Sequence, residues 1–356
     1  MKSLMSEGRK PIVIAGPCSA ESQEQLVEVA KELVEQNVSL LRAGIWKPRT
    51  RPGSFEGVGS IGLQWLQVAK QETGIKTATE VANVKHVYEA LKTGVDVLWI
   101  GARTTSNPFA VQEIADALQG VDIPVLVKNP INPDVDLWVG AIERLKKAGI
   151  MDVGAIHRGV SYFGDGLYRN KPEWQMPIEL KKRIPELSLI SDPSHIAGKR
   201  SLLLTVAQKA MDLDFDGLMI ETHPTPHLAL SDADQQITPW ELKELLSRLI
   251  IREEKPVDVI PETLDDLRAS INQIDDDLLE LLSIRMKVAR NIGEYKKSNN
   301  MTVLQQSRWN GLLDTLVEKG NNKELSSHFV EKVYKSIHDE SINQQVRIIN
   351  RSEELV

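Results

Sequence analysis

The chain has 356 residues, of which 41% are hydrophobic and 26% charged, and its formal net charge is −7. This composition is typical of a globular protein, and the length predicts one large domain and one small one. The acidic balance argues against nucleic acid as a partner, and no apolar run is long enough to cross a membrane. The first residues lack a signal-peptide pattern and Cys18 is the single cysteine, so we expect a cytoplasmic protein without an intrachain disulfide.

The chain from residue 12 to about residue 222 alternates short β-branched runs with amphipathic stretches, which is typical of strand–helix units around a parallel sheet. Eight such runs predict a closed (β/α)8 TIM barrel. A doubly wound sheet is the rival interpretation, but no G-x-G-x-x-G follows the first run and eight units are many for that fold. The predicted strands are PIVIAGPCS, SLLRAG, IKTATE, DVLWIGAR, PVLVKN, MDVGAIHRG, LSLISDPSH and DGLMIETH.

The barrel is expected to fill residues 1–253 and to close with a helix at TPWELKELLSRLIIRE. A linker is predicted at residues 254–261, because the segment EEKPVDVIP contains two prolines and has no helical period. Residues 262–356 are expected to form a small all-α domain of three helices.

The first predicted helix of this domain has apolar residues at alternating spacings of three and four, which is a heptad seam. Two further helical patterns cover residues 303–318 and 324–350, with GNN at 320–322 as the break between them. Three helices bury little apolar surface alone, so we expect this domain to pair with a second copy and to make the protein a homodimer.

Basic residues gather at the predicted carboxyl ends of the barrel strands, where active sites of such barrels lie. Any one of these basic residues would ordinarily be interpreted as a surface charge, but six at equivalent positions would not. Because buried unpaired charges are costly, the set predicts anionic ligands or neutralising carboxylates. The six residues are Arg42, Lys47, Arg49, Arg103, Lys128 and Arg158.

Other strand ends carry side chains that bind metals. Thiolate, imidazole and two carboxylates suit a divalent transition ion such as Mn²⁺, Fe²⁺, Co²⁺ or Zn²⁺ better than Mg²⁺. Taken singly, a cysteine is usually a small buried side chain and a histidine a structural hydrogen-bonding group, so the pattern alone leaves both interpretations open. The candidate ligands are Cys18, His195, Glu221 and Asp232.

Together these segments resemble the type I synthases of 3-deoxy-D-arabino-heptulosonate 7-phosphate (DAHP), over almost all of residues 10–250. The resemblance is to the compact subgroup and implies condensation of phosphoenolpyruvate with erythrose 4-phosphate. KPRT separates the chain from the sister enzyme, 3-deoxy-D-manno-octulosonate 8-phosphate synthase, which has a KANR-type segment there. The motifs are GPCS at 16–19, LRAG at 41–44, KPRT at 47–50, GAR at 101–103, KNP at 128–130, HRG at 157–159, DPSH at 192–195, IETH and LSDADQ.

The resemblance also implies roles for individual residues. Arg103 and Arg158 would bind the phosphoenolpyruvate phosphate, and Arg42, Lys47 and Lys128 would face its carboxylate. Arg49 and Thr50 would bind the aldose phosphate. Lys47 would donate a proton to the new hydroxyl and Glu80 would position a water, while Cys18, His195, Glu221 and Asp232 would hold the metal.

In the helical domain, the seam spacing continues from Leu281 onto Arg285, a cation where an apolar residue is expected. Lys296 lies eleven residues further, which is about 20° around the same face and about 16 Å along it, a gap suited to a small dianion. Arg268 lies about 100° away on another face, so it cannot serve the same pocket from the same helix. It could serve the pocket of a partner chain.

This pattern resembles the all-helical chorismate mutases over about residues 262–350, through LRASINQID, LLSIRMKVARNIGEYK, SRW and DESINQQ. The resemblance implies that chorismate is rearranged to prephenate by restraint and charge, without a nucleophile. The implied carboxylate-binding residues are Arg285, Arg308 and the partner chain's Arg268. The ether oxygen would be bound by Lys296 and Gln345, with Ser341 one turn before.

Two positions depart from that family. Gln305 stands where an acid is common but can still bind the substrate hydroxyl, whereas Trp309 cannot replace the usual glutamate, and reduced mutase activity would follow. The alternative is a module that serves only for dimerisation or regulation, which leaves Arg285 in the seam unexplained. Because the barrel has no evident regulatory insertion, any feedback ligand is expected to be prephenate, bound at the mutase.

Overall fold

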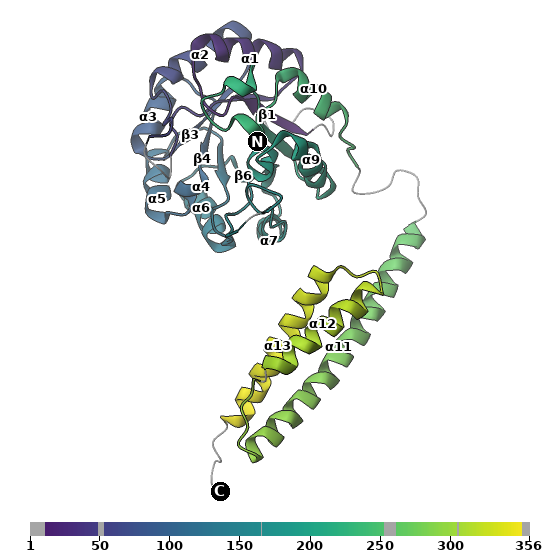
Figure 1. The fold of residues 1–356 in the computed structure, drawn as a ribbon. Helices are drawn as coiled ribbons and strands as arrows, with labels where there is room; N and C mark the ends of the chain where they lie inside the picture. The colour runs from purple at the N-terminus through teal and green to yellow at the C-terminus, as the bar shows by residue number, and fades with distance from the viewer. Residues whose placement is uncertain (1–10, 49–52, 165, 253–260, 305, 351–356) are drawn as a thin grey trace. The chain divides into compact units, whose positions relative to one another are not determined.

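The structure is a computed structural model that divides into two compact units, Met1–Lys255 and Pro256–Val356 (Figure 1). It describes residues 11–48, 53–164, 166–252, 261–304 and 306–350. No helix among these residues is both long and apolar enough to span a lipid bilayer.

The first unit is a closed barrel of eight parallel strands, each paired with its neighbours in chain order, and β8 pairs with β1 (Figure 1). The predicted (β/α)8 barrel is therefore confirmed. All eight predicted runs overlap a strand, because β-branched and apolar runs buried on both faces suit a parallel sheet. The strands are β1 (Ile12–Gly16), β2 (Leu40–Arg42), β3 (Thr77–Val81), β4 (Val97–Ile100), β5 (Val125–Lys128), β6 (Val153–His157), β7 (Ser188–Ser191) and β8 (Gly217–Glu221).

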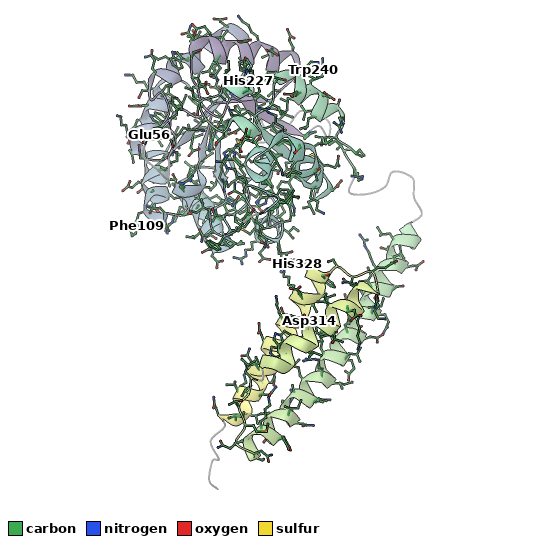
Figure 2. The ribbon with its side chains drawn as sticks, viewed as in Figure 1. Glu56, Phe109, His227, Trp240, Asp314 and His328 are labelled. Atoms are coloured by element: carbon green, nitrogen blue, oxygen red, sulfur yellow. The ribbon has the colours of Figure 1, made fainter. Side chains whose placement is uncertain are left out.

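Two apolar layers hold the barrel together. Side chains such as Ile14, Trp99 and Met219 fill its interior with no exposed surface. A larger cluster packs the outer faces of the strands against the surrounding helices, whereas Phe109, on the outside of the barrel, is 84% exposed (Figure 2). The filled interior restricts ligand binding to the ends of the strands.

The barrel helices begin at local caps. The Ser22 side chain accepts the N–H of Gln25 at the start of α1, and Thr238 with Glu241 forms a capping box ahead of Pro239 at α10. The last helix ends at Ser247, earlier than the sequence suggested. The helices are α1 (Gln23–Glu35), α2 (Ile61–Thr73), α3 (Val84–Lys92), α4 (Ala102–Thr105), α5 (Pro108–Ala117), α6 (Val135–Lys147), α7 (Gln175–Arg183), α8 (Pro193–Ala197), α9 (Leu203–Asp212) and α10 (Pro239–Ser247).

Over its described residues the second unit consists of three helices, as predicted: α11 (Pro261–Ser298), α12 (Gln306–Asn321) and α13 (Ser327–Ile349). The break between α12 and α13 falls after Asn321, so two of the three expected breaker residues still belong to α12. Gly320 lies against α13, because a Cβ atom on it would lie 2.4 Å from Cγ2 of Val330. The glycine thus allows the end of α12 to approach α13 closely.

Candidate active sites

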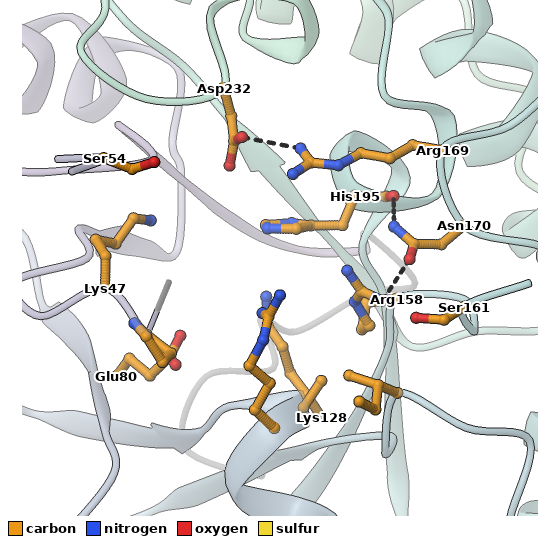
Figure 3. A pocket seen from close by; sticks show the side chains of 14 residues that line it. Lys47, Ser54, Glu80, Lys128, Arg158, Ser161, Arg169, Asn170, His195 and Asp232 are labelled. Carbon is orange, nitrogen blue, oxygen red and sulfur yellow. Dashed lines mark hydrogen bonds and ion pairs between the residues drawn. The ribbon is translucent and has the colours of Figure 1, made fainter. Parts of the chain in front are cut away.

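A pocket of about 440 Å³ opens at the carboxyl ends of the barrel strands (Figure 3). It brings together seven of the residues singled out from the sequence, although they are spread over 186 positions of the chain. Their convergence follows from the barrel, which places all eight strand ends in one ring. The seven residues are Lys47, Glu80, Arg103, Lys128, Arg158, His195 and Asp232.

Two of the predicted cations are neutralised by buried carboxylates. Nη1 of Arg42 lies 2.7 Å from Oε1 of Glu221, and Nζ of Lys128 lies 2.8 Å from Oδ2 of Asp192. Arg42 also stacks over the ring of Trp99 and is 2% exposed, so it lies beneath the pocket and does not line it. The two carboxylates explain how the charges of Arg42 and Lys128 can be buried. Arg158 lies at the pocket wall, and although burial lowers its pKa to about 10, it remains a cation at neutral pH.

Three of the four predicted metal ligands form a compact group. The ligand atoms of Cys18, Glu221 and Asp232 all lie within 4.8 Å of one another. His195 adjoins this group, with Nε2 3.7 Å from Oε1 of Glu221 and Nδ1 2.9 Å from Oδ2 of Asp192. Metal bonds of about 2.0–2.3 Å place neighbouring ligands roughly 3–4 Å apart, so the three-residue group is compact enough for a divalent ion and His195 lies beside it.

The protonation of these groups also suits a metal. Burial lowers the pKa of His195, which leaves a neutral imidazole, and Asp192 orients its ring by accepting from Nδ1. Burial opposes ionisation of Asp232, yet the Arg169 guanidinium holds the pKa of that carboxyl well below its usual value. Burial and the charge of Glu221 raise the pKa of the Cys18 thiol to about 12, so a bound cation would have to displace its proton.

Lys47 lies between the pocket and the candidate metal ligand Cys18. Its Nζ donates to the carbonyl oxygen of Cys18 at 2.6 Å and lies 3.0 Å from Sγ of the same residue. The turn that carries it needs Gly44, because a Cβ there would lie 2.5 Å from the Cys18 carbonyl oxygen and 2.9 Å from Nζ of Lys47. An ammonium group therefore lies where the pocket meets the candidate metal ligands.

Glu80 is held at the pocket wall by β3 and β4. Its Oε2 accepts from Nε1 of Trp99 at 2.9 Å. A Cβ on Gly101 would lie 2.1 Å from Oε1 of Glu80, so only glycine leaves room for this carboxylate. Arg49 and Thr50, predicted to bind the aldose phosphate, lie outside the described residues.

The sequence reasoning missed three residues of the site. Asp192 could have been found, because it directly follows β7 and caps α8 three residues before His195, accepting from the His195 N–H. Arg169 and Asn170 also line the pocket, but they come from the long connection between β6 and α7. No rule about strand ends points to that connection.

A second pocket, of about 640 Å³, lies within the helical unit. Nη1 of Arg285 donates to Oγ of Ser341 at 2.5 Å, and Nζ of Lys296 donates to Oε1 of Gln345 at 3.0 Å. Residues from α11 and α13 thus meet at one pocket, where the cations lie beside apolar side chains such as Ile292. A small, partly apolar dianion fits this arrangement.

The remaining predicted mutase residues are placed less fully. Arg268 is exposed, pairs with Asp265 at 3.2 Å and does not line this pocket. Gln305 lies outside the described residues, as does the side chain of Arg308. Trp309 lines the pocket and stacks on His338, with ring centroids 3.7 Å apart, so an aromatic pair occupies the position where family members carry a glutamate.

Comparison with known proteins assigns both units. Residues 2–254 match the family model described as the DAHP synthetase I family, and residues 267–346 match chorismate mutase type II. The phospho-2-dehydro-3-deoxyheptonate aldolase of Thermotoga maritima is 32% identical over 237 residues, covering 67% of this chain and 68% of that protein. The 2-dehydro-3-deoxyphosphooctonate aldolase of Wolinella succinogenes is 27% identical over 258 residues, covering 67% and 98%.

Solved structures agree with this assignment. The DAHP synthase of Thermotoga maritima superposes with a TM-score of 0.59 at 30% identity, covering 66% of each chain. Its truncated form gives 0.58 at 29% identity, covering 66% of this chain and 83% of that one. This chain thus spans about two thirds of the length of the Thermotoga protein that it matches. It belongs to the DAHP synthetase I family and has a C-terminal chorismate mutase type II domain, so both enzyme classes expected from the sequence are present.

Proposed function

We propose that the barrel condenses phosphoenolpyruvate with erythrose 4-phosphate to DAHP and phosphate, and that the helical domain rearranges chorismate to prephenate. The observation that carries the first half is the barrel pocket, where Lys47, Arg103 and Arg158 lie beside a thiol, an imidazole and two carboxylates. Two phosphorylated substrates need such a concentration of cations in an otherwise acidic chain.

The barrel residues divide the work of the reaction. Arg103 and Arg158 hold the phosphate of phosphoenolpyruvate, so that its methylene carbon faces the aldehyde carbon of the aldose. A C–C bond forms between these carbons, and Lys47 donates a proton to the aldehyde oxygen as it becomes a hydroxyl. Glu80 positions the water that adds to the cationic carbon left behind, after which the C–O bond to phosphate breaks.

We propose that Cys18, His195, Glu221 and Asp232 hold a divalent Mn²⁺, Fe²⁺, Co²⁺ or Zn²⁺ ion. When bound, such an ion polarises the aldehyde as a Lewis acid. A thiol among the ligands favours a transition ion over Mg²⁺ and also fits the reducing cytoplasm, where we expect the protein to act.

The mutase proposal is carried by Arg285 and Lys296, two cations that face one apolar pocket. The rearrangement breaks one C–O bond and forms one C–C bond without proton transfer. Restraint of the substrate and a hydrogen bond to the ether oxygen, from Lys296 and Gln345, are therefore what catalysis requires. Ser341 holds the Arg285 guanidinium in place.

We further propose that the mutase domains pair into a homodimer. The apolar seam of α11 supports this, because residues such as Leu267, Ile274 and Leu281 are more than half exposed in the single chain. Contiguous apolar surface of this kind usually marks an interface. Arg268 belongs to the same exposed stretch of α11, so pairing could bring it to the partner's pocket.

We also propose that prephenate, bound at the mutase pocket, inhibits the synthase. A tenfold loss of synthase affinity requires only about 1.4 kcal/mol of differential binding between two domain arrangements. The alternative, in which the helices serve only for association or regulation, predicts no mutase activity in any form of the chain.

One set of assays tests the proposal. Both reactions are measured on the full chain and on fragments cut between Lys255 and Pro256, where the two units divide. The first fragment should carry the synthase and the second the mutase. The synthase assay is run with erythrose 4-phosphate and with a five-carbon aldose phosphate. The second aldose is the relevant rival because the octonate named for the Wolinella relative has eight carbons, five more than phosphoenolpyruvate. Absence of both reactions with metal supplied would refute the proposal.

A further inference from the structure

The connection between β6 and α7 returns to the active site and ends in Arg169 and Asn170, two polar residues that line the pocket. The proposed function assigns neither of them a role. In Figure 3 a dashed line joins Arg169 to Asp232, and two dashed lines join Asn170 to Arg158 and to His195.

Asn170 makes two hydrogen bonds that link separate parts of the site. Its Oδ1 accepts from Nη1 of Arg158 at 2.7 Å, and its Nδ2 donates to the carbonyl oxygen of His195 at 2.6 Å. The residue is 6% exposed, so both bonds are shielded from water. One amide thereby fixes the guanidinium at the end of β6 and the backbone of the candidate metal ligand after β7.

Arg169 makes a corresponding link to the carboxylates. Its Nη1 lies 3.0 Å from Oδ1 of Asp232 and donates to Oε1 of Gln235 at 2.6 Å. Gln235 is 1% exposed and passes the link on, because its Nε2 donates to Oε2 of Glu221 at 2.7 Å. Arg169 itself is 43% exposed, and exposed ion pairs contribute little to stability, so the contact is better explained by orientation of the two carboxylates.

The backbone around the two residues is fixed independently of these side chains. Val160 and Lys171 pair through two hydrogen bonds of 2.8 and 2.9 Å, which closes the connection at its base. The N–H groups of Arg169 and Asn170 donate to the carbonyl oxygens of Ala197 and Ile196. The segment is therefore attached to the chain that carries His195.

Gly198 permits this attachment. Its φ is +69°, and a Cβ on it would lie 2.3 Å from Cβ of Arg169. Both the left-handed backbone and the contact favour glycine. The position of the two side chains is thus set by backbone contacts that would survive their replacement.

We propose that Arg169 and Asn170 are positioning residues for the synthase: Arg169 orients Asp232 and Glu221 for the metal, and Asn170 holds both Arg158 for the substrate phosphate and His195 for the metal. The inference rests on the proposed function of the barrel. It predicts that the two residues have different signatures, because only Asn170 contacts Arg158. Arg169 should affect metal binding alone.

The test uses the full chain with Arg169→Gln, Asn170→Ala and the control Lys171→Ala. Lys171 adjoins the pair and is charged, but its side chain contacts Glu173 outside the pocket. Mn²⁺ affinity is measured by competition with a chromophoric chelator, and phosphoenolpyruvate affinity is measured on metal-free protein by calorimetry. Mutase activity and the thermal midpoint report whether each variant folds. Arg169→Lys, which keeps the positive charge, should retain part of the Mn²⁺ affinity that Arg169→Gln loses.

Loss of an outer partner of a metal ligand typically weakens metal binding about 10–100-fold. For Arg169→Gln we expect Mn²⁺ affinity to fall by that factor, while phosphoenolpyruvate affinity changes less than about threefold. For Asn170→Ala we expect about tenfold losses of both Mn²⁺ and phosphoenolpyruvate affinity. Lys171→Ala should leave both affinities unchanged. Wild-type Mn²⁺ affinity in Arg169→Gln, or an equal loss of phosphoenolpyruvate affinity in both variants, would overturn the inference. Failure of the wild-type chain to bind either ligand would instead overturn the proposed function.

Discussion

The pH dependence of barrel stability offers a quantitative test of the structure, because β6 ends in a histidine with no exposed surface. Nε2 of His157 lies 2.5 Å from the carbonyl oxygen of Pro172, to which it must donate, and Nδ1 has no hydrogen-bond partner among the described residues. The ring packs against Trp174, Trp138 and Phe215, with centroids 5.4–6.3 Å away. Burial in this setting lowers the pKa of His157 to about 4.

The sign and size of the effect follow from linkage. The unfolded chain protonates this histidine near pH 6.5, whereas the folded chain keeps it neutral down to about pH 4. The stability that comes from keeping His157 neutral is therefore fully present above pH 6.5 and is lost as the pH falls toward 4. At pH 5 the loss is about 1.5 pH units at about 1.36 kcal/mol each, or roughly 2 kcal/mol.

The assay compares wild type with His157→Gln, whose amide can still donate to Pro172 but does not titrate. Urea unfolding at pH 7 and pH 5 is followed by tryptophan fluorescence, which reports mainly the barrel because six of the seven tryptophans lie there. The wild-type chain should lose about 2 kcal/mol more than the variant between the two pH values. His227→Gln, at an exposed site labelled in Figure 2, should behave as wild type. Equal losses in wild type and His157→Gln would refute the reasoning.

Three further predictions concern the two activities. Chelation should abolish the synthase but spare the mutase, and Cys18→Ala should act like chelation; full synthase activity after dialysis against excess chelator would exclude the metal assignment. Mixing Arg268→Ala and Lys296→Ala chains should restore about a quarter of the wild-type mutase rate, since half of the dimers would hold one intact site of two; no recovery after demonstrated subunit exchange would indicate self-contained sites. Prephenate should inhibit the full-length synthase but not the isolated barrel, and an unaffected full-length rate at saturating prephenate would exclude this feedback.

The barrel could be predicted because its signal is repeated. Most strands are short runs of β-branched or other apolar residues that are buried on both faces, and eight repeats argue against a doubly wound sheet. Helix ends were harder to place. The apolar pattern predicts that the helix α10 continues through LIIRE, yet it ends at Ser247. An apolar pattern does not show where tertiary contacts cease to support a helix.

The pocket could be predicted as far as one rule reaches. Residues at the ends of parallel strands must meet, which identified Lys128, Glu221 and their neighbours without knowledge of distances. The rule does not say which charges face the pocket and which are neutralised beneath it. Arg42 is the clearest case, because its pairing with Glu221 depends on the register of β1 and β2 against β8.

Arg169 and Asn170 illustrate what a sequence pattern omits. They lie eleven and twelve residues after Arg158, in a connection with no strand or helix period, and their partners are up to 66 positions away. Their placement depends on backbone pairing between Val160 and Lys171 and on the absence of a side chain at Gly198, neither of which leaves a recognisable spacing. Residues that perform chemistry can be found by type and position, since few side chains serve a given reaction. Residues that orient them can be of almost any polar type, so they become visible only when the contacts are known.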